Sequence, residues 1–197
     1  MPGKPRRNTA TRSLLRPVKH HASPDLRMTS CGFEAIAGTD ARVLILGSLP
    51  GAASLACGEY YAQPRNAFWP IMGELVGAAP TLAYKERVQV LVGERIALWD
   101  VCARATRKGS LDTAIVATSV RPNDIGGFLQ SHPGIQVICF NGTKAADLFR
   151  RRVVPQLQPE ALAIRRVTLP STSPAHAAMP FQKKLQAWRA AVAEPEA

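Results

Sequence analysis

The sequence predicts an α/β fold with three layers, in which helices cover both faces of a central, mostly parallel four-stranded sheet. Four short apolar runs each end at a Gly, Asp, Asn or Pro residue, which is typical of buried strands. Amphipathic stretches with helical spacing separate these runs. Strands that alternate with helices form a parallel sheet with helices on both of its faces.

The first predicted strand covers residues 41–46 and ends at Gly47, because its apolar, β-branched run stops there. The other three predicted strands are 96–99, 136–140 and 164–169. Helices are predicted over 66–77, 84–93, 143–153 and 180–192, with short helices over 111–117 and 124–131. Phe68 and Trp69 open the first of these helices, and we expect both to pack in the core.

Length and charge predict one domain with a basic extension. The chain has 197 residues, 46% of them hydrophobic, and a net charge of +11, which favours a polyanionic partner such as nucleic acid. Residues 1–30 hold seven basic residues, one acidic residue and four prolines, so we expect a disordered basic tail. This tail is interpreted as a DNA-gripping arm, a targeting peptide or a stretch upstream of a start at Met28. Residues 31–197 form the single predicted domain.

The four cysteines, Cys31, Cys57, Cys102 and Cys139, contain no close pair, so a CxxC-type zinc or iron–sulfur site is not predicted. We expect them to be small buried residues in a reducing compartment. No metal and no cofactor is expected. The sequence has neither a membrane-spanning apolar run nor a signal-peptide core, which predicts a cytoplasmic protein associated with the nucleoid through DNA.

Unusual polar residues follow each predicted strand: 47–51, Asp100, 141–142 and 171–174. In an open parallel sheet, the carboxyl ends of the strands form the ligand crevice, so these four turns are expected to meet at one site. The first turn lacks the Lys-Ser/Thr ending of a phosphate-binding loop and the spacing of a dinucleotide fingerprint. An ATPase or an NAD enzyme is therefore not favoured.

Several single residues suggest what such a site does. Tyr61 lies in a loop before a proline, where its ring suits stacking against a planar base. Asn66 is either a helix N-cap or an amide that holds a water. Asp100 is either a turn cap or a functional carboxylate. The stiff, hydroxyl-rich stretch 169–177 is suited to contact a DNA phosphate.

The stretches "GSLPG", "YAQPRNAFW" and "LPSTSPAHA", taken in order, resemble the motifs of the uracil-DNA glycosylase superfamily. The resemblance covers about residues 32–190 and is closest to the hypoxanthine-DNA glycosylase branch. It implies a uracil-DNA glycosylase-like fold and an enzyme of base excision repair. Such an enzyme flips a deaminated base out of DNA and hydrolyses its N-glycosidic bond, leaving an abasic site.

The resemblance also implies roles for residues. Asn66 would position the attacking water, Tyr61 would stack on the base and Asp100 would read its edge. The remaining implied base-binding residues are Gly47, Ser48, Leu49, Gly51 and Asn141. The implied DNA-binding residues are Ser171, Thr172, Ser173, Ala175 and His176.

Two positions depart from the better-known branches. Leu49 stands where those branches carry an Asp or Asn that orients water, and Ser171 stands where they carry a His or Asn. A mismatch-specific uracil or thymine glycosylase and an inactive lesion-binding module therefore remain alternatives. Hypoxanthine, uracil and xanthine all remain candidate bases, in double- or single-stranded DNA. No lysine lies in the motifs, so a monofunctional enzyme without lyase activity is expected, and a monomer is the expected state.

Overall fold

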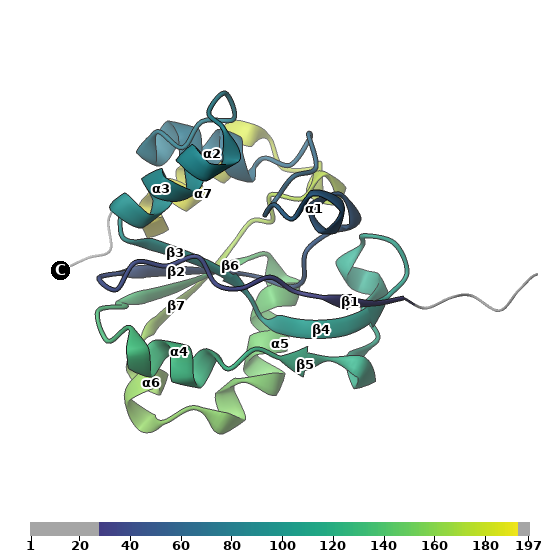
Figure 1. Ribbon diagram of the computed structural model, residues 1–197, viewed down its shortest axis with the longest axis vertical. Helices are drawn as coiled ribbons and strands as arrows, with labels where there is room; N and C mark the ends of the chain where they lie inside the picture. The colour runs from purple at the N-terminus through teal and green to yellow at the C-terminus, as the bar shows by residue number, and fades with distance from the viewer. Residues whose placement is uncertain (1–27, 193–197) are drawn as a thin grey trace, which may run out of the picture.

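The computed structural model describes residues 28–192, which form two sheets and the helices around them (Figure 1). The main sheet has four parallel strands in the order β3-β2-β6-β7. Its strands are β2 (Val43–Gly47), β3 (Ile96–Asp100), β6 (Val137–Asn141) and β7 (Arg165–Leu169). The four strands match the predicted runs, and the predicted fold class is confirmed.

Helices cover both faces of this sheet, because successive residues of a strand point to opposite sides. Val43 and Ile45 belong to one buried cluster, and Leu44 and Leu46 belong to the other. The first cluster packs under α2 (Phe68–Val76), α3 (Tyr84–Gly93) and α7 (Phe181–Val192). The second packs against α4 (Ile125–Ser131), α5 (Thr143–Arg152) and α6 (Pro159–Ala163), on the opposite side in Figure 1.

A second, antiparallel sheet was not predicted. It consists of β1 (Met28–Cys31), β4 (Cys102–Arg107) and β5 (Arg121–Pro122), in the order β1-β4-β5. The prediction that the tail extends to residue 30 is therefore wrong for residues 28–30, which pair with β4 instead. Residues 1–27, which make up the rest of the predicted tail, lie outside the described residues.

The segment 111–117 also differs from its prediction. Instead of one short helix it contains the 3-10 turn η1 (Asp112–Ala114), and a second 3-10 turn, η2 (Ala117–Ser119), begins at its last residue. The chain between the turns is held by β4, because Ile115 forms a bridge with Arg107. A six-residue helix, α1 (Ala52–Cys57), was not predicted either; it follows the turn after β2.

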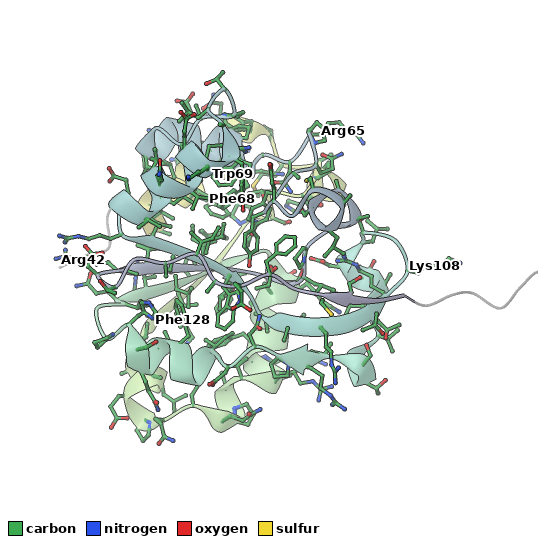
Figure 2. The ribbon with its side chains drawn as sticks, in the orientation of Figure 1. Arg42, Arg65, Phe68, Trp69, Lys108 and Phe128 are labelled. Atoms are coloured by element: carbon green, nitrogen blue, oxygen red, sulfur yellow. The ribbon has the colours of Figure 1, made fainter. Side chains whose placement is uncertain are left out.

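Phe68 and Trp69 are buried at the top of the sheet, as predicted, and Figure 2 shows both pointing toward it. The prediction for the cysteines is correct for two of them. Cys102 and Cys139 are buried, whereas Cys31 and Cys57 are exposed. Between residues 28 and 192, no helix has the length and apolar character needed to cross a membrane.

Candidate functional site

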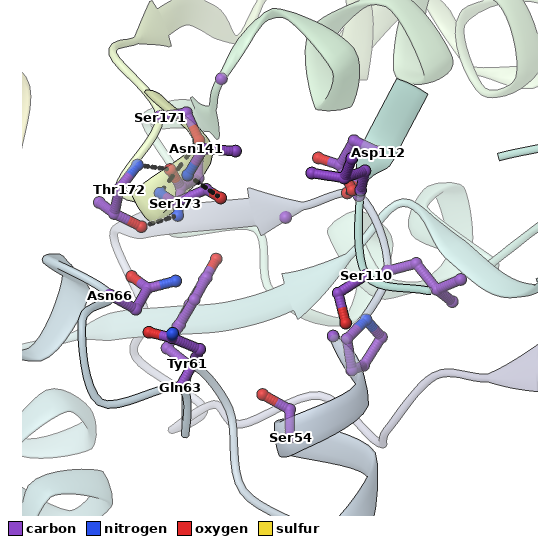
Figure 3. Close-up of a pocket in the computed structure, with 18 of the residues that line it drawn as sticks. Ser54, Tyr61, Gln63, Asn66, Ser110, Asp112, Asn141, Ser171, Thr172 and Ser173 are labelled. Atoms are coloured by element: carbon purple, nitrogen blue, oxygen red, sulfur yellow. Dashed lines mark hydrogen bonds between the residues drawn. The ribbon is translucent and has the colours of Figure 1, made fainter. Parts of the chain in front are cut away.

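A cavity of about 680 Å³ lies at the carboxyl ends of the parallel strands, and Figure 3 shows part of its lining. Its size falls in the range of small-molecule sites, about 300–1,000 Å³. The four polar turns meet here, as the position of the strand ends predicts. Every residue that the sequence singled out lines the cavity: Gly47, Ser48, Leu49, Gly51, Tyr61, Asn66, Asp100, Asn141, Ser171, Thr172, Ser173, Ala175 and His176.

The floor of the cavity is made where β2 and β3 end side by side. Gly47 pairs with Asp100 in the register of the two strands. A β-carbon at Gly47 would collide with Asp100 Oδ1 and would lie 3.1 Å from the Tyr61 hydroxyl. Only glycine fits this position, because the carboxylate and the phenol both approach its α-carbon.

Asp100 is a buried carboxyl group with an unused oxygen. Its side chain is 3% exposed, and its Oδ2 has no hydrogen-bond partner among the described residues. Burial and, to a smaller extent, the negative charge of Asp112 raise the pKa of Asp100 to about 8, against the opposing effect of Arg107. Asp100 is therefore a neutral acid at pH 7, able to donate one hydrogen bond and accept others.

Tyr61 is held in a fixed orientation. Its backbone adopts the left-handed region with φ 55°, which is uncommon for a residue with a side chain. Its ring stacks on Phe68 with the ring centroids 4.0 Å apart and the planes 25° apart. The hydroxyl is buried without a hydrogen-bond partner in the described part of the chain, and burial and then Asp100 raise its pKa. Phe68 covers one face of the Tyr61 ring, and Tyr61 itself lines the cavity.

Asn66 lies at the entrance to α2. Its Oδ1 accepts the Phe68 N–H at 3.0 Å, so the side chain satisfies one of the free N–H groups at the start of this helix. The N-cap residue itself is Ala67, one position later than predicted. The Ala67 N–H donates to the Thr172 carbonyl at 3.0 Å, which joins this entrance to the hydroxyl-rich loop.

A pair of amide hydrogen bonds fixes that loop. Asn141 Nδ2 donates to Thr172 Oγ1 at 2.8 Å, and the Thr172 N–H donates to Asn141 Oδ1 at 2.9 Å (Figure 3). Thr172 is 1% exposed, so its hydroxyl points inward. Ser171 and Ser173 on either side of it are partly exposed at the rim.

Sequence reasoning missed the ionic group that supports the first turn. Arg107 on β4 donates to the carbonyl oxygens of Leu49, at 3.3 Å, and of Pro50. Its guanidinium lies 3.7 Å from Asp112 Oδ1, which also accepts a 2.6 Å hydrogen bond from the Ser48 hydroxyl. Burial lowers the pKa of Arg107 and raises that of Asp112. A buried arginine in a strand that was not predicted leaves no signal in one sequence.

Other unpredicted residues line the cavity as well. Ser110 Oγ accepts the Ala52 N–H at 2.9 Å, which fastens the 110–112 segment to the start of α1. Figure 3 shows Ser110 and Asp112 on the opposite side of the cavity from Ser171–Ser173. Lys144 near the start of α5 lines the cavity too, although it lies outside the sequence motifs. The Leu49 side chain is 5% exposed and belongs to a core cluster.

Comparisons with known proteins agree with this geometry. The family model described as "Uracil DNA glycosylase superfamily" matches residues 34–194. The chain belongs to this superfamily. The resemblance predicted from the three sequence motifs is thereby confirmed.

Two curated relatives, both named "Hypoxanthine DNA glycosylase", come from Methanosarcina acetivorans and Methanosarcina barkeri. They are 37% and 32% identical over 121 residues, which span 61% of this chain and 75% of each relative. A solution structure titled as a putative uracil DNA glycosylase from Methanosarcina acetivorans has a TM-score of 0.65 and 31% identity. That comparison covers 82% of this chain and 98% of the other.

Proposed function

We propose that this protein is a DNA N-glycosylase of base excision repair that removes hypoxanthine, and also uracil or xanthine. The observation that carries the proposal is the pair of unsatisfied polar atoms at the cavity floor, Asp100 Oδ2 and the Tyr61 hydroxyl. Buried polar groups in proteins are almost always hydrogen-bonded, so two orphans in one cavity indicate a missing ligand. Membership of the superfamily and the two relatives named "Hypoxanthine DNA glycosylase" support a deaminated base as that ligand.

The base-binding role follows from the protonation of Asp100. Hypoxanthine presents an N1–H donor beside a C6 carbonyl acceptor, and uracil presents an equivalent N3–H and C4 carbonyl. A neutral carboxyl group accepts the N–H and donates to the carbonyl at the same time. Tyr61, with Phe68 behind its ring, supplies a flat surface against which the base stacks.

The reaction adds water to C1′ of the sugar and breaks the bond between C1′ and the base nitrogen. The electron pair of that bond leaves with the base, which takes up a proton. In this proposal Asn66 holds the water through its amide, because Oδ1 accepts the Phe68 N–H with one lone pair and keeps a second lone pair, beside the NH₂ group, for the water. Leu49, which is buried in the core, takes no part in holding water. Hydrogen bonds to the leaving base supply much of the acceleration, since charge develops there in the transition state.

The rim is proposed to bind the DNA backbone. Ser171 and Ser173 present hydroxyl and N–H groups to the phosphates, with Ala175 and His176 next to them. Thr172 contributes by position only, because its side chain is buried against Asn141. We expect the protein to act as a cytoplasmic monomer on nucleoid DNA, in duplex and single-stranded forms.

The test is base release from DNA that carries hypoxanthine, uracil or xanthine at one site. Asn66→Ala and Asn66→Ser are compared with the wild type, since serine keeps an acceptor for the Phe68 N–H and lacks the amide. We expect hypoxanthine release by the wild type, and release reduced by roughly 100-fold or more in both variants. Full release by Asn66→Ser would show that the side chain acts only as a helix cap. No base released by the wild type would refute the function.

The absence of lyase activity is a separate part of the proposal. Lys144 lines the cavity, so an amine is present near the expected sugar position. Borohydride reduction during the reaction traps any Schiff base between a lysine and the abasic sugar. We expect no covalent adduct, with the wild type and Lys144→Met giving the same result. An adduct that disappears in Lys144→Met would show a bifunctional enzyme.

A further inference from the structure

We propose that Leu111 is the wedge that enters the base stack when the target nucleotide leaves the duplex. This inference rests on the proposed function, because a glycosylase must flip its base. Proteins that distort DNA often insert an apolar side chain between base steps and so replace part of the lost stacking. A wedge must be apolar, exposed before binding, near the pocket that receives the base, and firmly held.

Exposure and place single out Leu111. Among residues 28–192, the exposed large hydrophobic side chains are Leu111, Leu162 and Phe181, at 56%, 41% and 36%. Of these, only Leu111 lines the cavity. An apolar side chain this exposed at the rim of a polar cavity gains free energy when it is buried against stacked bases.

The other side of the rim offers no comparable group. The exposed tip of the hydroxyl-rich loop carries Ala175, His176 and Ala177. The resemblance implies that Ala175 and His176 contact the DNA, but an alanine is too small to fill the space of a base and the imidazole of His176 is polar rather than apolar. Leu111 lies in the segment on the opposite side of the cavity, next to Ser110 and Asp112, which Figure 3 labels.

Both neighbours of Leu111 are fastened. Ser110 Oγ accepts the Ala52 N–H at 2.9 Å, and Asp112 Oδ1 accepts from Ser48 and lies beside Arg107. These contacts tie the leucine to the turn after β2, which also makes the cavity floor. The wedge and the base pocket therefore form one rigid unit, so that insertion of one aligns the other.

The test compares Leu111→Ala with Leu162→Ala, a matched change at an exposed leucine on α6 that does not line the cavity. Hypoxanthine release is measured under single-turnover conditions on duplex DNA and on the same strand alone. Only a duplex has a stack to fill. We expect Leu111→Ala to slow release from the duplex by roughly 10-fold or more and to leave single-strand release unchanged. Leu162→Ala should match the wild type on both, and Leu111→Met should recover most of the duplex rate.

A binding experiment gives the same answer without catalysis. It uses a duplex that holds a tetrahydrofuran abasic analogue, with 2-aminopurine in the neighbouring position to report stacking by fluorescence. We expect the wild type to bind this duplex with a fluorescence change, and Leu111→Ala to bind more weakly with a smaller change. Equal losses on duplex and single strand, or no loss on either, would overturn the wedge. Failure of the proposed function is seen separately, as a wild type that releases no base.

Discussion

The two sides of the cavity are fixed by different chemistry. On one side, the uncharged amide of Asn141 and the buried Thr172 exchange two hydrogen bonds. On the other side, Arg107 and Asp112 form a charged group that supports the turn after β2 and the 110–112 segment. The neutral pair is insensitive to pH and salt. The charged group depends on pH because Asp112 is ionisable, and its charges also act on the pKa of Asp100.

This difference indicates a division of labour. The neutral side holds the loop proposed to bind phosphates. A buried charge there would carry a desolvation penalty without contacting the DNA. The charged side adjoins the proposed base pocket and adds to the effect of burial on the Asp100 pKa, which Asp112 raises and Arg107 lowers. Substitutions on the two sides should therefore differ in their effect on the free energy of unfolding and on its pH dependence.

The largest effect is expected from Arg107→Met. The Arg107 side chain is 1% exposed, and its loss leaves the Leu49 and Pro50 carbonyls without their donor and the Asp112 carboxylate without its cationic partner. We expect the free energy of unfolding to fall by about 3–5 kcal/mol, measured by urea denaturation. Arg104→Met is the matched control, because Arg104 is exposed on the same strand, and it should stay within about 0.5 kcal/mol of the wild type. Equal effects of the two variants would contradict the support role.

The second effect concerns pH. Because burial raises the pKa of Asp100 to about 8, the folded protein keeps a proton between about pH 4 and 8 that the unfolded chain has lost. Stability contributed by this proton is therefore complete at low pH and declines as the pH rises toward 8. Asp100→Asn removes the dependence.

The check is urea denaturation at pH 5 and pH 7. We expect Asp100→Asn to become more stable relative to the wild type by about 2 kcal/mol between these two pH values. The exposed Asp147 on α5 gives the control, since Asp147→Asn should leave the pH slope close to that of the wild type. Parallel pH profiles for the wild type and Asp100→Asn would mean that Asp100 is ionised in the folded state.

Prediction from the sequence works for the part of the site that lies at the ends of the parallel strands. The strands β2, β3, β6 and β7 were predicted because each is an apolar run that ends at a Gly, Asp, Asn or Pro residue. Their ends place Gly47, Asp100 and Asn141 at one edge, so the predicted cavity residues come together. This part of the site depends on a general property of parallel sheets, and it can be read from the chain.

The charged side could not be predicted in this way. The β4 sequence, Cys-Ala-Arg-Ala-Thr-Arg, buries Cys102, Ala105 and Arg107, so its buried positions do not alternate and one of them is an arginine. Its pairing with β1 joins segments more than 70 residues apart, which no local pattern reports. The acceptors of Arg107 are backbone carbonyls, so they carry no residue signature. Asp112 was hidden inside a segment predicted as a helix.

The third prediction concerns the hydrogen bonds between Asn141 and Thr172 on the neutral side. Asn141→Ala removes both hydrogen bonds and leaves the buried Thr172 N–H and hydroxyl without partners, which should cost about 1–3 kcal/mol of unfolding free energy. Thr172→Val removes only the side-chain bond and should cost less. Both losses should be the same at pH 5 and pH 7, unlike the Asp100 effect. A loss that changes with pH would show that the two sides are not independent.

The smallest effect on stability is expected from Ser110→Ala, which releases Leu111 from α1 on one flank. The hydrogen bond to the Ala52 N–H is exposed, so its loss should lower the free energy of unfolding by less than about 1 kcal/mol. Ser131→Ala, which removes an exposed hydroxyl on α4, is the control for that small loss.

The rate of base release distinguishes Ser110→Ala from Ser131→Ala. Ser110→Ala should slow release from duplex DNA several-fold and leave release from a single strand unchanged, because a loosened wedge still has the intact pocket beside it. If duplex release stays at the wild-type rate, Asp112 alone holds the leucine, and the charged side of the cavity positions the wedge as well as the base.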